Sequence, residues 1–320
     1  LPLEAVTFGE VLQEAGYETG YIGKWHLGKT GGEPLYQGFG TSIMAGASGA
    51  PPSYFWPYEK RGGDDSGKAF EPYTGGQEGE YLVDRMTDEA LQFIEDKKDS
   101  PFLLVLAHYA VHTPIQAPEK LSDKYRDKIR EQKVLEGGPR SDLDVAVDNT
   151  GQYKTVQNNA VYAAMVDSVD TNLGRIIDRL GELGLTENTV IVLTSDHGGL
   201  SSRGLDSKRE LATSNLPYRH GKGWLYDGGI RVPMIVKWPA GIEAGSASQV
   251  QVTGTDHFPS LLEMAGLPMQ PDHHRDGRSY LPALKGGDYV RDPMFFHSSL
   301  GRPSQTGDTR SSAVIHGNWK

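Results

Sequence analysis

The sequence contains no cysteine, which rules out disulfides, thiolate metal sites and cysteine nucleophiles within its 320 residues. It also lacks a long apolar run: the longest, Phe102 to Ala107, is far too short to cross a bilayer. Positive charge is scarce, because 32 Lys and Arg face 42 Asp and Glu and leave a net charge of −10. An acidic chain without clustered cations is a poor candidate for binding nucleic acid.

The length fits one large domain, or one and a half, with room for a sizeable core. The 40 glycines and 19 prolines indicate many ordered turns. Leu1-Pro2-Leu3-Glu4 has neither an initiator Met nor a signal-peptide pattern, and residues 312–320 alternate like a strand that stops at Lys320. We therefore expect a piece of a longer protein, whose localisation these residues do not encode.

Helical and strand patterns alternate along the chain. Thr7 and Glu10 form a capping-box pattern at the start of a short helix that Gly16 ends. Unbroken apolar runs of strand length indicate strands that are buried on both faces. The predicted helices are 7–15, 80–97, 160–183 and 257–265, and the predicted strands are 17–23, 102–107, 189–194 and 232–236. This order predicts an α/β fold with a parallel or mostly parallel sheet.

Residues 28–79 show no periodicity and are rich in glycine, proline and aromatic residues, which predicts a long ordered surface excursion. Its aromatic stretch, residues 54–58, has two interpretations, a wall for stacking sugars or simple packing of the loop. Asp64 and Asp65 lie among glycines in the same excursion and fit a solvated turn.

Polar residues follow three of the predicted strands. Lys24-Trp25-His26 comes after the first, residues 108–114 with His108 and His112 after the second, and Asp196-His197 after the third. A fourth group, residues 220–223 with Lys222 between two glycines, precedes the strand at Val232. Sites in open α/β sheets form beyond the carboxyl ends of the strands, so three groups are expected along one edge.

The combined chemistry favours a small anion. Two lysines converging on a cleft would hold negative charge, Asp196 and His197 would offer oxygen and nitrogen to a divalent cation, and imidazoles move protons near neutral pH. Together they suit hydrolysis or transfer at a tetrahedral oxyanion ester, either a phosphate or a sulfate.

Several of these residues also have simpler interpretations. Trp25 fits packing, His108 fits a hydrogen-bonded core histidine, and Asp196 alone fits a helix N-cap as well as a metal ligand. His273 and His274 fit an exposed loop. Only the shared position of the polar groups favours a site.

Three runs carry a family resemblance. Residues 15–28, which end in Gly-Lys-Trp-His-Leu-Gly, resemble the second signature of the type I sulfatases, the arylsulfatase family. Thr194-Ser195-Asp196-His197-Gly198 resembles the family's later metal-binding strand end, and residues 221–233 resemble its downstream lysine loop. The runs occur in the family's order along essentially the whole chain.

The resemblance implies an alkaline-phosphatase-like α/β/α sandwich over residues 1–290 and the beginning of a smaller C-terminal subdomain over 291–320. By position, Lys24 would contact the sulfate and the nucleophile, and His26 would hydrogen-bond the nucleophile. His112 and Lys222 would bind the sulfate, with His112 protonating the leaving oxygen. Asp196 and His197 would supply part of a divalent metal site, with Ca²⁺ favoured, although asparagine is more typical than histidine beside that aspartate.

One departure outweighs the matches. Active members carry a Cys/Ser-x-Pro-x-Arg run whose first residue becomes formylglycine, and this chain has no cysteine and no Ser-x-Pro-x-Arg. The family's first-strand aspartates also have no counterpart. We expect both upstream of Leu1, so the 320 residues alone should be inactive while a full-length parent hydrolyses aryl or carbohydrate sulfates. The resemblance further implies a periplasmic or extracellular location.

Two alternatives remain open. One is a phosphoester or phosphonate hydrolase of the same superfamily, against which the single Asp196-His197 pair argues because two-metal phosphatases need more ligands. The other is a non-catalytic relative that binds sulfated glycans through Lys24, His112 and Lys222.

Overall fold

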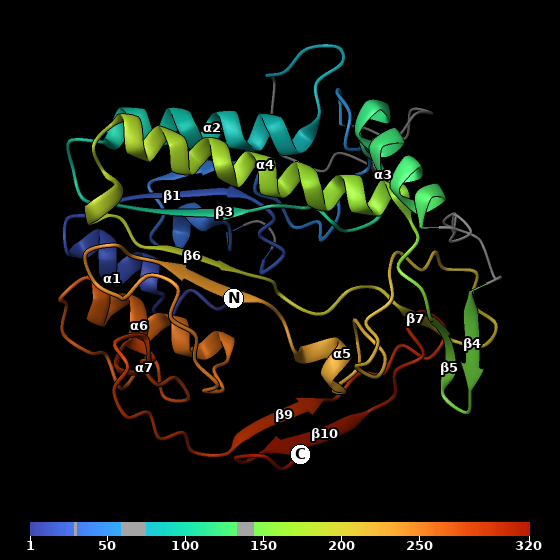
Figure 1. Cartoon of the computed structure of the whole chain (residues 1–320). Helices are drawn as coiled ribbons and strands as arrows, with labels where there is room; N and C mark the ends of the chain where they lie inside the picture. Colours follow the sequence, from blue (N-terminus) through green and yellow to red (C-terminus); the bar gives the residue numbers. More distant parts are fainter. Residues whose placement is uncertain (29–30, 59–74, 133–143) are drawn as a thin grey trace. The chain divides into compact units, whose positions relative to one another are not determined.

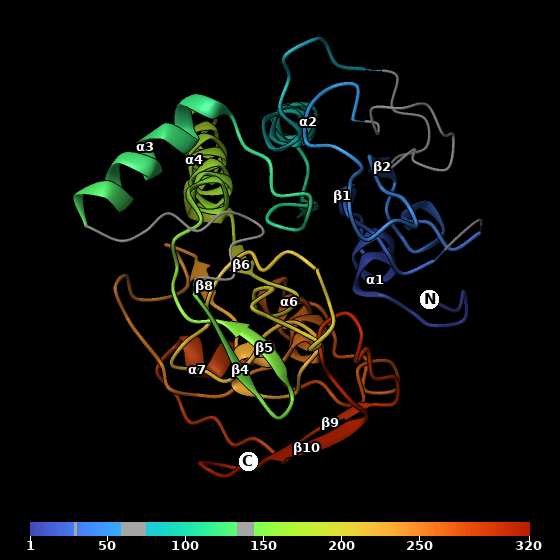
Figure 2. The same ribbon diagram turned by 90° about the vertical axis from the view of Figure 1, so that its right-hand side faces the viewer.

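The computed structural model describes residues 1–28, 31–58, 75–132 and 144–320 (Figures 1 and 2). The chain divides into two compact units, each built from three segments. Unit 1 comprises residues 1–116, 165–189 and 238–289, and unit 2 comprises residues 117–164, 190–237 and 290–320. The following paragraphs describe each unit by itself.

Unit 1 is built on a three-stranded parallel sheet. Strand β1 (Glu18–Gly23) lies in the middle, between β2 (Thr41–Ile43) and β3 (Phe102–Ala107). The register pairs Glu18 with Phe102 and Gly23 with Ala107, so β1 and β3 end side by side. The predicted parallel sheet is confirmed here. Its central strand is β1, however, while β3, the most apolar run, forms an edge of this described sheet.

Helices cover both faces of this sheet. On one face α2 (Leu82–Lys97) places the Phe93 ring where a side chain on Gly20 would lie, which explains a glycine inside β1. Helix α4 (Ala160–Glu182) runs beside α2, above β1 and β3 in Figure 1. Against the other face, α1 (Phe8–Glu14) begins with the predicted capping box, in which Glu10 N–H donates to the Thr7 hydroxyl at 3.1 Å.

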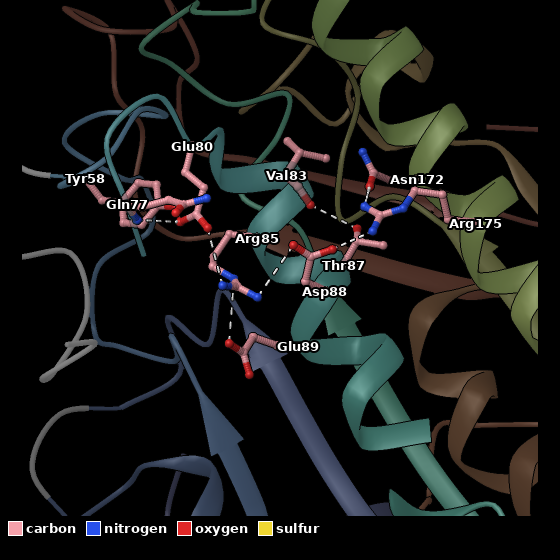
Figure 3. A network of polar contacts seen from close by, with 10 residues as sticks. All are labelled: Tyr58, Gln77, Glu80, Val83, Arg85, Thr87, Asp88, Glu89, Asn172 and Arg175. Atoms are coloured by element: carbon pink, nitrogen blue, oxygen red, sulfur yellow. Dashed lines mark hydrogen bonds and ion pairs between the residues drawn. The ribbon is translucent and has the colours of Figure 1, made fainter. Parts of the chain in front are cut away.

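A ladder of polar contacts joins α2 to α4. Asn172 donates to Asp84 at 2.7 Å, Arg175 donates to Asp88 at 2.5 Å, and Arg179 pairs with Glu95. Figure 3 shows how Arg85 extends the ladder to Glu80 at 3.3 Å, to Asp88 at 3.5 Å and to Glu89 at 3.6 Å. Every guanidinium on this face therefore has at least one carboxylate beside it.

The opposite face carries an aromatic cluster of Tyr21, Trp25 and Phe39 with edge-to-face rings. Trp25 is 6% exposed and its indole N–H donates to the Gly32 carbonyl at 2.7 Å, so it packs as predicted. Phe8 of α1 connects the cluster to Phe258 of α6. The remaining elements of unit 1 are α6 (His257–Met264), α7 (Leu281–Leu284) and the 3-10 turns Pro34–Tyr36, Thr186–Asn188 and Gly254–Asp256.

Unit 2 is mostly antiparallel. Strand β6 (Ile191–Thr194) pairs with β8 (Met234–Lys237). In a second sheet β5 (Gly151–Lys154) lies between β4 (Val145–Asp148) and β7 (Ser202–Arg203). In a third, β9 (Met294–Ser298) pairs with β10 (Ser311–Ile315). The described helices are α3 (Glu119–Glu131), α5 (Asp227–Ile230) and the start of α4. The segment between β6 and β8 contains the short β7 and the four-residue α5, and lacks the longer helix that usually connects parallel strands.

The aromatic stretch at residues 54–58 is largely packing. Tyr54 and Tyr58 are 0% and 3% exposed, whereas Trp56 is 39% exposed. Asp64 and Asp65 lie outside the described residues. None of the helices in the described ranges is long and apolar enough to span a membrane.

Candidate functional site

The first part of the candidate site lies at the end of β1 and β3 in unit 1. Lys24 N–H donates to the carbonyl of Ala107 at 2.8 Å, which extends the β1–β3 ladder by one step. Lys24-Trp25-His26 and the segment with His108 and His112 therefore leave the same edge of the sheet, as predicted. Parallel pairing causes this convergence of segments that lie about 85 residues apart in the sequence.

The backbone holds His26 in an uncommon conformation. Its φ is +56°, in the left-handed region that non-glycine residues rarely adopt. Its N–H donates to the Gly46 carbonyl at 3.1 Å, and a Cβ added to Gly49 would lie 2.5 Å from the His26 ring. Only a glycine at position 49 leaves room for the imidazole, whose side chain is otherwise exposed.

The ring of His112 is oriented by its own loop. Nδ1 lies 2.8 Å from the Thr113 carbonyl, which only accepts, so Nδ1 carries a proton. The Tyr54 hydroxyl donates to the His112 carbonyl at 3.0 Å, and the His112 N–H donates to the Tyr109 carbonyl at 2.9 Å. In the neutral ring the unprotonated nitrogen is therefore Nε2.

His108 differs from His112 although it lies four residues away. Its Nδ1 is buried and has no hydrogen-bond partner among the described residues. Burial lowers the pKa of His108 to about 4, so the ring is neutral at pH 7. The core position is as expected, but no hydrogen bond to Nδ1 is present in the described part of the chain.

The second part lies in unit 2, after β6. His197 Nδ1 donates to the Gly198 carbonyl at 2.9 Å, which leaves Nε2 without a proton in the neutral ring, and Nε2 lies 3.4 Å from Asp196 Oδ2. A backbone carbonyl on the far nitrogen is the usual way to orient a metal-binding imidazole. The pair therefore fits a partial metal site. No group of three or more His, Asp or Glu side chains suited to a metal occurs among the described residues.

The lysine loop is hydrogen-bonded to the turn after β6. Lys222 N–H donates to the Gly199 carbonyl at 3.1 Å, and Gly198 N–H donates to the Gly229 carbonyl at 2.9 Å. Any Cβ at Gly198 would collide with the Gly228 carbonyl, so this approach requires glycine. The segments that carry Asp196, His197 and Lys222 are thus joined through their backbones.

Asn215 is the residue at the centre of this assembly. Its side-chain NH₂ lies 3.0 Å from the carbonyls of Gly199 and His220, 3.0 Å from the Ser201 hydroxyl and 3.1 Å from the Gly228 carbonyl. One amide therefore serves the turn after β6 and both sides of the lysine loop. Sequence reasoning missed it because a single asparagine in an irregular segment has no pattern.

His220 anchors the start of the lysine loop. The Thr150 hydroxyl donates to Asp148, so His220 Nε2 must donate to Thr150 Oγ1, at 2.8 Å. The ring also stacks on Trp224 with centroids 4.2 Å apart. Burial lowers the pKa of His220. The nearby Asp148 carboxylate opposes this shift only in part, so the ring packs as a neutral group.

Comparison with known proteins identifies the family. The model of the Sulfatase family matches residues 1–267. The chain belongs to the sulfatase family. Human steryl-sulfatase is 33% identical over 218 residues, covering 68% of this chain and 32% of that protein. The N-acetylgalactosamine-6-sulfatase of Canis lupus familiaris is 29% identical over 339 residues, covering 100% of this chain and 54% of that protein.

A solved structure agrees with the sulfatase assignment. The crystal structure of Ps i-CgsB in complex with k-i-k-neocarrahexaose matches with a TM-score of 0.71 at 27% identity, covering 92% of this chain and 61% of that one. The predicted alkaline-phosphatase-like α/β class is confirmed by such matches and by the parallel sheet of unit 1. This sulfatase chain spans a third to a half of the length of the curated relatives named above. Membership of the family implies a metal and a formylglycine in general.

Proposed function

We propose that the protein to which this chain belongs is a sulfuric ester hydrolase that cleaves aryl or carbohydrate sulfates to an alcohol and inorganic sulfate. The observation behind the proposal is that the sulfatase match over residues 1–267 includes Lys24, His26 and His112, which follow the paired strands β1 and β3. Cations and imidazoles beyond the carboxyl ends of parallel strands suit the binding of a tetrahedral anion.

Each side chain has a role that its chemistry allows. Lys24 and Lys222 hold the negative charge of the sulfate, and His26 hydrogen-bonds the nucleophile. His112 is the proton donor for the leaving oxygen: its Nδ1 proton is held by the Thr113 carbonyl, so the exchangeable proton is on Nε2. The tests are His112→Gln and Lys222→Ala in the longer protein, each expected to lower kcat/KM at least about 100-fold.

Asp196 and His197 would hold a divalent cation, for which we propose Ca²⁺. The carboxylate is a hard oxygen ligand, and His197 Nε2 is oriented by the bond from Nδ1 to the Gly198 carbonyl. When bound, the cation supplies positive charge that polarises the sulfate oxygens. Removing metal with a chelator should abolish activity of the longer protein, and adding back Ca²⁺ rather than Zn²⁺ should restore it.

The nucleophile is not among these 320 residues, which contain no cysteine and no Ser-x-Pro-x-Arg run. We therefore propose that the 320-residue chain hydrolyses no sulfate ester by itself. The test compares this purified chain with the complete gene product on 4-nitrophenyl sulfate. Robust metal-dependent turnover by the 320 residues alone would contradict the proposal, and so would a complete gene product without a Cys/Ser-x-Pro-x-Arg run.

Carbohydrate sulfates are the proposed substrate class, and a periplasmic or extracellular location goes with it. Ps i-CgsB binds a neocarrahexaose, and the N-acetylgalactosamine-6-sulfatases are named for a sugar sulfate. Of the aromatic residues in this stretch only Trp56 is exposed, so it is the residue for stacking on a sugar. Trp56→Ala should raise KM for a glycan sulfate and leave 4-nitrophenyl sulfate unaffected.

The alternatives make distinct predictions in the same assays. A phosphoester or phosphonate hydrolase would turn over 4-nitrophenyl phosphate faster than the sulfate. A non-catalytic glycan-binding protein would bind sulfated sugars without turnover even with its nucleophile segment present.

A further inference from the structure

Two loops of unit 2 meet beside the lysine loop. Residues 203–209 follow β7, and residues 301–308 lie between β9 and β10. Gly204 packs so closely on the Pro303 carbonyl that no Cβ fits there, and the Ser207 hydroxyl lies 3.5 Å from the Gln305 carbonyl. The two loops are therefore in direct contact.

The second of these loops also lies against the residue that follows Lys222. A Cβ added to Gly223 would be 2.9 Å from Arg302 Nη2 and 2.5 Å from Asp308 Oδ1. The Trp224 indole donates to the Thr306 carbonyl at 2.9 Å, which fixes this contact. The Arg302 guanidinium thus lies against the backbone next to Lys222.

Charge is unbalanced where the loops meet. Arg302 has one carboxylate nearby, since its Nε lies 3.7 Å from Asp308 Oδ1. The Asp308 carboxylate also accepts hydrogen bonds from the Thr306 hydroxyl and, at 3.2 Å, from the Arg302 backbone N–H. Arg209 has none: among the described residues its guanidinium donates no hydrogen bond and has no carboxylate within ion-pair distance. Its only polar contacts there are through its backbone, from Arg203 at 3.0 Å and to Ser207 at 3.2 Å.

Arg209 is half-buried as a residue. Its side-chain nitrogens are nevertheless accessible to solvent, because they form no hydrogen bond and are absent from the set of enclosed, unpaired atoms in the described ranges. Burial, and then the charge of Arg302, lowers the pKa of Arg209. A partly buried cation that has no counterion and lies near a second cation is energetically unfavourable unless a bound anion neutralises its charge. Guanidinium groups bind sulfate and carboxylate through paired N–H donors.

We propose that Arg209 and Arg302 form a second anion site next to Lys222, which binds a further sulfate or a carboxylate on the same sugar substrate. The inference rests on the proposed function, in which Lys222 binds the sulfate that is cleaved. It assigns the protein to substrates with two or more anionic groups.

The test is calorimetric binding to the 320-residue chain, which needs no nucleophile. The probes are glucosamine 2-N,6-O-disulfate, with two anionic groups, and N-acetylglucosamine 6-sulfate, with one. Arg209→Gln should weaken binding of the disulfate about 10-fold and binding of the monosulfate less than about 2-fold. Arg209→Lys should recover part of the loss, because it keeps the charge without the paired donors.

Arg130→Gln is the matched control, since Arg130 is also in unit 2, is 70% exposed and pairs with Asp127. The melting temperature of Arg209→Gln should equal or exceed that of the parent, because the side chain makes no hydrogen bond that the substitution removes. Equal weakening of both probes by Arg209→Gln, or no weakening of either, would overturn the proposal.

These outcomes separate the inference from the proposed function. Turnover of sulfated sugars by the complete gene product with no effect of Arg209→Gln on disulfate binding refutes the second anion site alone. Binding of the disulfate that depends on Arg209, without turnover by the complete gene product, refutes the hydrolase and leaves the anion site standing.

Discussion

The α2–α4 face of unit 1 and the lysine-loop assembly of unit 2 are built from opposite kinds of interaction. On the first, Arg85, Arg175 and Arg179 all have carboxylate partners, and the paired side chains are between 16% and 63% exposed. In the second, one neutral amide, Asn215, serves several backbone acceptors. The first has more charge, and the second has more burial.

Burial decides which of the two matters more for stability. Water and salt screen exposed ion pairs, so each contributes little, on the order of 1 kcal/mol or less. An enclosed carbonyl that loses its donor pays its full desolvation cost, about 1–3 kcal/mol. Each arginine of the α2–α4 face should therefore stabilise the fold less than the single amide of the lysine-loop assembly.

Asn215→Ala is the strongest test of this difference. We expect the free energy of unfolding to fall by about 2 kcal/mol, because the Gly228 carbonyl loses its donor, whereas the carbonyls of Gly199 and His220 each keep one other donor. Urea denaturation monitored by circular dichroism measures the change, and Asn188→Ala, at an exposed asparagine, is the control. A loss below about 1 kcal/mol would show that water replaces the amide and that burial is not decisive here.

His108 tests burial in the other unit, since it is a half-buried residue of unit 1 whose Nδ1 atom is enclosed. Its pKa is about 4 in the folded chain against 6.5 in the unfolded one. Between these values the unfolded chain binds the proton and the folded chain does not, so stability falls as the pH drops from 6.5 towards 4. The loss attributable to His108 should be on the order of 2–3 kcal/mol, and there should be none above pH 7.

The measurement is the difference in unfolding free energy between the parent and His108→Gln at pH 7 and at pH 4. His257 and His220 also have lowered pKa values, so only the difference between the two proteins isolates His108. His273→Gln, at an exposed histidine, controls for the substitution itself. A His108 ring that titrates near 6.5 by NMR would contradict the expectation.

Arg85→Gln should give the smallest effect. Although three carboxylates lie near Arg85, we expect a loss of about 1 kcal/mol, shrinking further in 1 M salt. Thermal unfolding of the parent and of Arg85→Gln at low and at high salt measures the loss of stability and its dependence on salt. A loss that exceeds that of Asn215→Ala, or one that salt leaves unchanged, would reverse the ranking of the two regions.

Local patterns predicted much of unit 1. The Thr7 capping box, the helices near residues 80–97 and 160–183 and the strand ending at Gly23 occur within a few residues of their expected places. These elements depend on caps and periodicity within a few turns of chain, which a sequence displays directly. Unit 2 was predicted less well. Helix α3 was missed although Leu121, Tyr125 and Ile129 recur every four residues, and the short β4–β5 hairpin and β9 show little pattern.

The candidate site shows the same division. Lys24, His26, His112, Asp196, His197 and Lys222 could all be proposed from their positions after or before strands. Asn215 could not, because it acts through hydrogen bonds to backbone groups of other segments. The hydrogen bonds of Tyr54 to the His112 carbonyl and of His220 to the Thr150 hydroxyl could not be predicted either. Nothing in the chain near these residues indicates their partners.

The sequence by itself determined the family, the chemical types at the strand ends and the absence of cysteine and of a Ser-x-Pro-x-Arg run within these 320 residues, since each is a property of residue identity and order. The tertiary structure alone decided that β1 is the central strand of its sheet, that the Tyr54 hydroxyl donates to the His112 carbonyl, and that Arg209 lies half-buried near a second arginine. These properties depend on distances between segments remote in the chain, and a linear pattern does not contain such distances.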